Sequence, residues 1–278
     1  MDDSSRQGPP LRPKDLADHL LAHGTPVVTL AEAAALLGQS LTAAATTLHR
    51  LQRRGLLFRP ARGLYIAVSP EYRTWNSVPA MDFIDPMMRI LGRRYYVGLL
   101  SAAELWGASH QRPQVFQVLV DEHVRDRAFG RVRLRFYEAK QAKTAETIKR
   151  NTSTGQAEIS PTARTCLDLW QWVHESGGLS NVATVVADLV EQHALIAQDF
   201  IDLASDYPSS VLRRLGFGLH VAIQQGSDAQ VDLDALAAVA NPDAGKRATA
   251  KLDPSAPQRG AVSNRWGLVI NGEVEVDQ

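Results

Sequence analysis

The chain has 278 residues and a mass of 30.4 kDa, with 45% hydrophobic and 22% charged residues. This composition excludes collagen-like, low-complexity and disulfide-framework proteins. The single cysteine, Cys166, excludes an intrachain disulfide and a cysteine-based metal site. The sequence has no run of about 18 apolar residues, and its acidic, proline-rich N-terminus does not resemble a signal peptide. We therefore expect a cytoplasmic protein with no membrane partner, and the length is typical of two domains.

The net charge of zero conceals an uneven distribution. Residues 1–49 hold 3 basic and 5 acidic side chains, residues 50–150 hold 19 and 9, and residues 151–278 hold 8 and 16. The excess of basic side chains in residues 50–150 indicates that they bind a polyanionic partner or form ion pairs with the acidic last third of the chain. Charge alone does not distinguish the two.

Three short helices are expected after a disordered lead of residues 1–12. The first should cover residues 13–23. The second should begin after Thr29, because Thr29-x-x-Glu32 is a capping-box pattern, and should end at Gly38.

The third helix should begin after Ser40 and end at Gly55. Two β-rich stretches, 56–59 and 64–68, surround a turn signal at residues 60–63 and predict a hairpin. Three helices followed by a hairpin are typical of a winged helix-turn-helix, which we expect over residues 13–70.

The rest of the chain predicts a larger mixed α/β domain over residues 71–278, with a small sheet and several helices. The fold class is therefore α+β. Strands are expected at 114–122, 132–140 and 266–276, a loop at 241–265, and helices at 81–92, 99–109, 160–172, 181–193, 198–205 and 209–226.

The third helix has two distinct faces. Leu41, Ala44 or Ala45, Leu48 and Leu51 recur at helical spacing and should face the core. From Gln39 to Val68 the chain holds five arginines and no acid. Threonine can contact either base type or a thymine methyl, and arginine can bind guanine through two hydrogen bonds. The pattern predicts DNA binding through Ser40, Thr42, Ala43, Thr46, Thr47, Arg50, Arg53, Arg54, Arg59 and Arg62.

Within this set, Thr42, Thr46, Thr47 and Arg50 are expected at base edges. Arg53, Arg54, Arg59 and Arg62 are expected at phosphates or, for the wing, in the minor groove. The alternative is a solvated face of a helical protein–protein module, but packing alone does not require an acid-free arginine run.

Several longer segments resemble AbiEi-type antitoxins, the antitoxin halves of bacterial abortive-infection toxin–antitoxin pairs. The resemblance covers roughly Pro13 to the end. It is carried by Tyr95–Gly107, ISPTARTCLDLWQW, GGLSNVATVVADLV, Ser209–Leu219 and the terminal RWGLVINGEVEVD, together with the winged helix. None of these segments is a catalytic signature.

The resemblance implies a transcriptional autorepressor that binds inverted repeats in its own promoter. It also implies that the C-terminal domain neutralises a neighbouring nucleotidyltransferase toxin, with or without a stable complex. Sequestration, modification of the toxin and repair of its damage all stay open as mechanisms. We expect a monomer that pairs on DNA, since no heptad pattern for dimerisation is evident. No catalytic residue, metal or cofactor is predicted.

Two alternatives remain at this stage. The first is a plain winged-helix regulator without a toxin. The second is a metal-dependent, restriction-like nuclease, because Asp121 ends one strand while Glu138 and Lys140 end the next. The basic zone from Arg125 to Arg150 is also unassigned, and its arginines could pair with the acidic last third or bind nucleic acid or toxin.

Overall fold

The computed structural model describes residues 10–108, 114–242 and 250–276. It has a mixed α/β fold that forms two compact units. The first unit extends to Tyr96 and adds Leu119–Lys143 and Lys149–Glu158. The second comprises Val97–Val118, Thr144–Ile148 and the chain from Ile159 on. The boundary expected at residue 70 stays a prediction, and each unit is described by itself.

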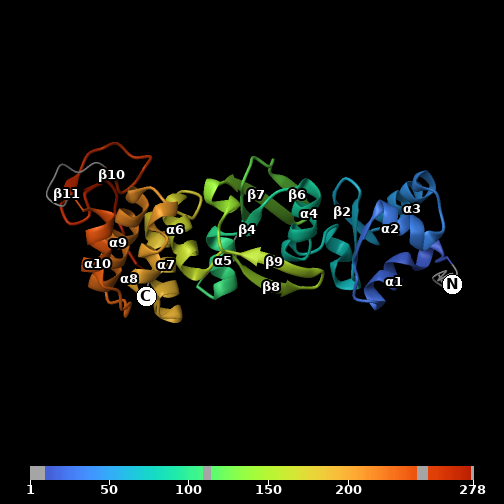
Figure 1. Ribbon diagram of the computed structural model, residues 1–278, viewed down its shortest axis with the longest axis horizontal. Coiled ribbons are helices and arrows are strands. Elements are labelled where there is room, and N and C mark those ends of the chain that lie inside the picture. The colour runs from blue at the N-terminus through green and yellow to red at the C-terminus, as the bar shows by residue number, and fades with distance from the viewer. Residues whose placement is uncertain (1–9, 109–113, 243–249, 277–278) are drawn as a thin grey trace, which may run out of the picture. The chain divides into compact units, whose positions relative to one another are not determined.

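The first elements form a winged helix-turn-helix, which confirms the predicted order of three helices and a hairpin (Figure 1). The short strand β1, which was not predicted, pairs antiparallel with β3 and gives a sheet of order β1-β3-β2. The elements are α1 (Leu16–Ala22), β1 (Val27–Thr29), α2 (Leu30–Leu37), α3 (Leu41–Arg53), β2 (Leu57–Ala61) and β3 (Leu64–Ala67).

The predicted caps set the limits of α2 and α3. Thr29 and Glu32 form a reciprocal capping box, and Gly38 ends α2 in the left-handed region at φ 61°. The backbone N–H of Ala43 donates to Ser40 Oγ at 3.3 Å, which begins α3. The two helices therefore meet across a turn of three residues.

The end of the expected disordered lead is ordered. Leu11 packs against the core of the winged helix, and its N–H donates to the carbonyl of Leu36 at 2.9 Å. Partial burial of an apolar side chain against a leucine-rich core is favourable, which explains why residues 10–12 differ from the expected disordered lead. The rest of the lead, residues 1–9, lies outside the described residues.

An aromatic cluster joins the wing to the rest of the first unit. The ring of Phe58, on β2, lies 5.0 Å from Phe83 and 5.2 Å from Phe129, in edge-to-face contacts. Nearby, Arg127 Nη1 donates to the carbonyl oxygen of Pro60 at 3.0 Å. The wing is therefore packed against the body of this unit on one side.

A six-stranded sheet has the order β6-β7-β5-β4-β9-β8. Strands β5 and β7 confirm the two predicted strands, whereas β8 and β9 lie in a polar stretch that gave no apolar alternation. Helix α4 (Ile84–Leu91) belongs to the first unit. The strands are β4 (Tyr95–Val97), β5 (Phe116–Val120), β6 (Arg127–Phe129), β7 (Val132–Glu138), β8 (Ile148–Thr152) and β9 (Gly155–Ile159).

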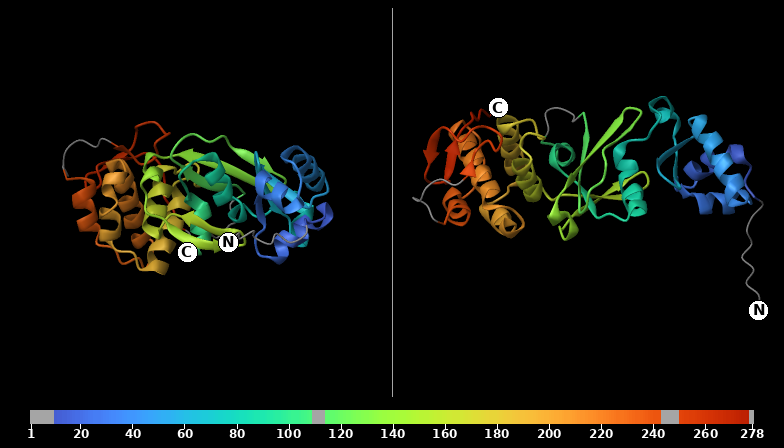
Figure 2. Two further views of the ribbon diagram at one scale, coloured as in Figure 1. Left: turned by 45° about the vertical axis from the view of Figure 1, so that its right-hand side comes forward. Right: turned by 90° about the horizontal axis from the view of Figure 1, so that it is seen from above.

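The second unit is built largely from helices, and α6, α7 and α9 pack against one another (Figure 2). Gly98 is the N-cap residue of α5, and α10 was not predicted. The expected loop 241–265 contains β10 and β11, and residues 243–249 lie outside the described part of the chain. The elements are α5 (Leu99–Trp106), α6 (Thr162–Gln171), α7 (Leu179–His193), α8 (Ala197–Ile201), α9 (Ser209–Gln224), α10 (Leu233–Ala240), β10 (Ala250–Lys251), β11 (Ala261–Ser263) and β12 (Leu268–Ile270).

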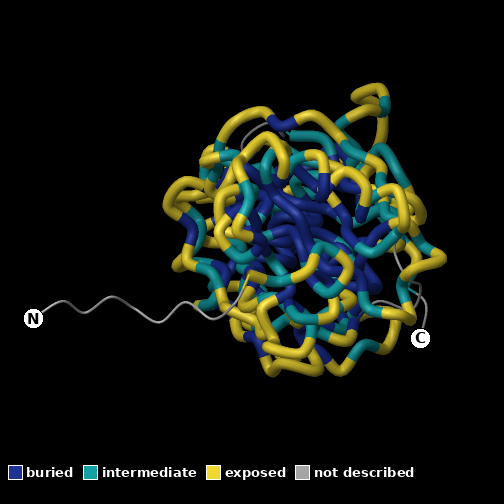
Figure 3. The backbone as a smooth tube through the Cα atoms, turned by 90° about the vertical axis from the view of Figure 1, so that its right-hand side faces the viewer, coloured by how far each residue is buried: buried dark blue, intermediate teal, exposed yellow. Residues whose placement is uncertain are grey.

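Two glycines let α9 pack against two indole rings. A methyl group at Gly216 would lie 2.1 Å from the ring of Trp266, and one at Gly218 would lie 2.2 Å from the ring of Trp170. Both tryptophans are fully buried. Buried residues in general occupy the inside, and exposed residues the outer surface (Figure 3).

We expect Gly218→Ala to destabilise the protein by about 1–3 kcal/mol, because the added methyl overpacks the core against Trp170. This loss is net of the helix propensity that alanine gains. Chemical denaturation measures the free energy of unfolding. The control is Gln224→Ala, an exposed position of the same helix, with an expected change below about 0.5 kcal/mol. Equal stability of Gly218→Ala and wild type would contradict the packing described for α9.

Candidate nucleic-acid interface

The exposed face of α3 carries most of the predicted base-edge residues. Thr42, Ala43, Thr46 and Arg50 are exposed, and Ser40 is exposed at the cap. The opposite face is buried through Ala44, Leu48 and Leu51, as predicted. Apart from Leu41, the exposed side chains of the first two turns are short, so the backbone of α3 can approach a groove floor closely.

Thr47 does not belong to this face. It is only 6% exposed, and its hydroxyl donates to Gln39 Oε1 at 3.1 Å. The predicted role of Thr47 at a base edge is therefore corrected, because the side chain is turned inward and hydrogen-bonded within the protein. The hydroxyl of Thr46 donates to the carbonyl of Thr42 at 3.2 Å, yet Thr46 itself remains exposed.

Leu41 is exposed, although it was predicted to be buried. The sequence places it on the core face, but it is 58% exposed. As the first residue of α3, it lies at the end of the helix, and helical side chains tilt towards the N-terminus. Its side chain therefore extends beyond the region that the core covers.

The predicted phosphate contacts lie at the end of α3 and on the wing. Arg53 and Arg54 are exposed at the C-terminal end of the helix. Arg59 is exposed on β2, with its guanidinium 5.8 Å from the centre of the Tyr65 ring. Arg62 is exposed in the hairpin turn, which Gly63 closes at φ 80°. These arginines supply positive charge on either side of the exposed threonines.

The interface is electrostatically one-sided. Within the described winged helix and its flanking helical turn, the ion pairs are Arg12–Asp15 at 2.6 Å and Arg73–Asp18 at 3.9 Å. Neither involves an arginine of α3 or of the wing. Because no carboxylate lies between Gln39 and Val68, this surface favours an anionic partner.

Two arginines of the second basic zone contact groups within the first unit. Arg135 Nε lies 3.5 Å from Asp126 Oδ2, and the guanidinium of Arg131 lies 5.8 Å from the centre of the Trp75 ring. A hydrogen bond to Tyr137 raises the pKa of Arg135, to which Asp126 also contributes. Arg133 is exposed on the same strand. For Arg135, the partner belongs to the same basic zone and not to the acidic last third.

The residues of the nuclease alternative do meet at two strand ends. Asp121 follows β5, Glu138 ends β7, and the N–H of Ala139 donates to the carbonyl of Val120 at 2.9 Å. Among residues 10–108, 114–242 and 250–276, however, no group of three or more histidine, cysteine or acidic side chains could hold a metal ion. Lys140 is exposed beside them. The nuclease stays an alternative prediction.

Buried polar groups of the second unit serve its core. Arg164 is 3% exposed and donates through Nη2 to Asp206 at 2.7 Å, and the hydroxyl of Tyr207 donates to Asp168 at 2.7 Å. Cys166, which lies between Arg164 and Asp168 in the sequence, is fully buried, and its burial raises the pKa of the thiol. Cys166 is therefore a small residue of the core.

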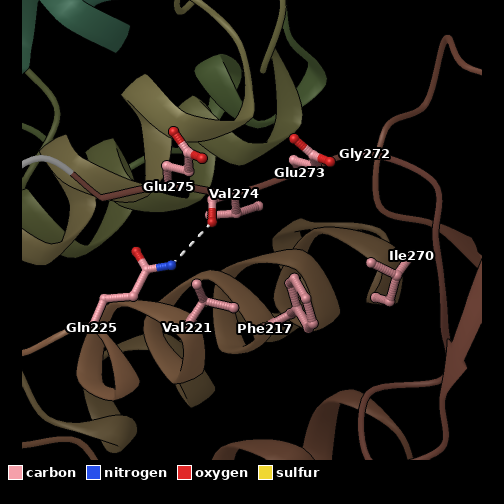
Figure 4. A pocket seen from close by; sticks show the side chains of 8 residues that line it. All are labelled: Phe217, Val221, Gln225, Ile270, Gly272, Glu273, Val274 and Glu275. Atoms are coloured by element: carbon pink, nitrogen blue, oxygen red, sulfur yellow. Dashed lines mark hydrogen bonds between the residues drawn. The ribbon is translucent and has the colours of Figure 1, made fainter.

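A pocket of 360 Å³ in the second unit lies between α9 and the C-terminal segment (Figure 4). Phe217 and Val221 line it from α9, while Glu273 and Glu275 line it from the other side, with their carboxylates pointing away from α9. Gln225 holds the segment through its backbone: Nε2 donates to the carbonyl of Val274 at 3.3 Å, and Oε1 accepts the N–H of Val276 at 2.8 Å. The sequence gave no signal for this pocket, since it joins residues about 50 positions apart.

Two family models match the chain. Residues 14–68 match the model described as "Transcriptional regulator, AbiEi antitoxin", and residues 96–221 match the model of the AbiEi antitoxin C-terminal domain. The chain belongs to the AbiEi antitoxin family. The resemblance found in the sequence is thereby confirmed, and the family assigns an antitoxin the general roles of toxin neutralisation and DNA-binding regulation.

The antitoxin also resembles a solved structure along nearly its whole length. The crystal structure of the RV2827C protein from Mycobacterium tuberculosis is similar with a TM-score of 0.63 and 16% identity, over 95% of this chain and 91% of that chain. At this identity the likeness shows the fold alone. No curated protein matches the chain. Among the described helices, none is both long and apolar enough to cross a membrane.

We expect Thr47→Val to change the stability of the protein and Thr46→Ala to change its DNA sequence preference. Thr47→Val removes the hydrogen bond to Gln39 and should lower the free energy of unfolding by about 1 kcal/mol, with unchanged DNA sequence preference. Thr46→Ala should preserve stability and reduce discrimination against mismatched sites by about 1 kcal/mol. Denaturation and competition binding measure the two quantities. If Thr47→Val loses sequence preference, Thr47 contacts DNA and the correction made for this residue is wrong.

We expect Arg62→Ala to weaken binding to every duplex and to reduce the slope of log affinity against log salt by about one unit, because one phosphate contact is lost. Titrations at several salt concentrations measure the slope on promoter and random DNA. The control is Arg259→Ala, an exposed arginine of the second unit, which should leave the slope unchanged. If the slope of Arg62→Ala equals that of wild type, Arg62 does not contact a phosphate.

Proposed function

We propose that this antitoxin represses its own promoter by binding inverted repeats, and that its C-terminal domain neutralises a nucleotidyltransferase toxin encoded next to it. The observation that carries the regulatory part is the exposed, acid-free face of α3 and the wing. Family membership supports the antitoxin part. The nucleotidyltransferase partner and the inverted repeats rest on the resemblance described above.

On DNA, α3 lies in the major groove with its N-terminal turn at the base edges. Thr42 and Thr46 touch bases there, and Ser40 and Ala43 allow close approach. Arg50 lies further along the same exposed face, where two of its three guanidinium nitrogens can bind guanine O6 and N7. This arrangement accounts for sequence preference.

Affinity comes mainly from the arginines at the ends of the interface. Arg53 is the last residue of α3, Arg54 is its C-cap, and Arg59 and Arg62 belong to the wing. Each phosphate that they neutralise releases counterions from the duplex, which makes binding salt-dependent. The wing arginines bind phosphates or the narrow minor groove beside the helix site.

An inverted repeat requires two copies of the chain related by a two-fold axis. We propose that monomers pair on adjacent half-sites, whose centres then lie about one helical turn of DNA apart or a multiple of it. The sequence has no heptad pattern that would hold a dimer in the absence of DNA. Binding should therefore be steep in protein concentration.

Neutralisation of the toxin, with or without a stable complex, is proposed to proceed through the second unit. Its core is dominated by buried helices, and the last third of the chain carries 16 acidic against 8 basic side chains. This body is chemically unlike the basic interface. The two tasks are therefore assigned to different surfaces.

The double variant Arg50→Ala with Arg62→Ala separates the two tasks. It should lose repression of a reporter under its own promoter, because one base contact and one phosphate contact are missing, and should still restore growth to cells that express the adjacent toxin. Reporter output and colony counts measure the two outcomes. Arg259→Ala should retain both.

Full repression by the double variant would contradict the proposed interface, and lost growth rescue would contradict the separation of tasks. If the adjacent gene encodes no toxin and growth rescue cannot be obtained with any neighbour, the plain regulator is favoured instead.

A further inference from the structure

Leu41 is an apolar side chain placed where a regulator meets base edges. It is the first residue of α3 and is 58% exposed, whereas Leu48 and Leu51 of the same helix are 0% and 3% exposed. Single exposed leucines are common on protein surfaces and need no function by themselves. The position of this one, at the N-terminal turn of the proposed recognition helix, gives it a specific neighbour.

The local structure fixes where this side chain lies. Ser40 caps the helix through the N–H of Ala43, so the first turn is held in place. Side chains of the first turn tilt past the N-terminal end of a helix. In a recognition helix this is the end whose residues contact base edges. Leu41 therefore precedes the exposed Thr42 and Ala43 at the end of α3 that the proposed function assigns to the bases.

The first turn of α3 presents more apolar groups than hydrogen-bonding side chains. Leu41, Thr42 and Ala43 are exposed there, and of these three only Thr42 carries a hydroxyl. The apolar group that base pairs present in the major groove is the C5-methyl of thymine.

We propose that Leu41 contacts the C5-methyl group of a thymine in each half-site and so determines sequence preference at that position. This proposal rests on the proposed DNA-binding function and deepens it. It divides the readout of α3 in two: the leading turn recognises a thymine through its methyl group, and Arg50 supplies hydrogen bonds further along.

The test removes the methyl group from the DNA. The operator is first located by footprinting the full-length protein on its own promoter. Each thymine in the footprint is then replaced by deoxyuridine, which keeps base pairing and lacks only the methyl. At one thymine per half-site, wild type should bind about fourfold more weakly, as expected for exposing one apolar carbon.

The matched variants are Leu41→Ala and Ile90→Ala. Leu41→Ala should bind the thymine and deoxyuridine operators equally well, with an unchanged melting temperature because the side chain is exposed. Ile90, on α4, is 47% exposed and outside the winged helix, so Ile90→Ala should retain the fourfold ratio.

A footprint with no deoxyuridine effect in wild type overturns the role of Leu41 and leaves the repressor function standing. If Leu41→Ala shows the same ratio of affinities for the thymine and deoxyuridine operators as wild type, the role of Leu41 is overturned in the same way. The absence of any footprint overturns both proposals. A ratio lost in Leu41→Ala and retained in Ile90→Ala supports the contact.

Discussion

The turn between α2 and α3 is the constraint on which the interface depends. Gly38 takes the left-handed conformation at φ 61°, and a methyl group there would lie 2.9 Å from Pro10 Cβ. Only glycine satisfies both demands without strain. The Ser40 cap then starts α3 at a fixed residue. Every assignment of an exposed or buried face on that helix follows from this starting point.

The local signals of the winged helix could be predicted from the sequence because they are short-range. The Thr29–Glu32 box, the Gly38 stop and the Ser40 cap each act within four residues, and the structure contains all three. Strand β1 could not be predicted in this way, since three residues show no alternation and its stability comes from pairing with β3. Strand β8 gave no apolar alternation either, because nearly all of its side chains are exposed.

The candidate interface was predictable in its charge and less so in its details. A helical wheel treats all positions on one face alike, which placed Thr47 outside and Leu41 inside. The structure reverses both, because Thr47 finds a partner in Gln39 while Leu41 lies beyond the end of the core. Likewise, the packing of Gly216 and Gly218 against two tryptophans depends on segments far apart in the chain. A single sequence does not reveal such long-range contacts.

The attachment of the wing has a thermodynamic consequence for recognition. A hairpin that is free in solution loses conformational entropy when a ligand orders it, and that loss reduces affinity. Here Phe58 anchors the hairpin to Phe83 and Phe129, and Arg127 holds the carbonyl of Pro60. The wing arginines are thus presented on a scaffold that is already ordered, so association should be limited by desolvation and charge and not by loop folding.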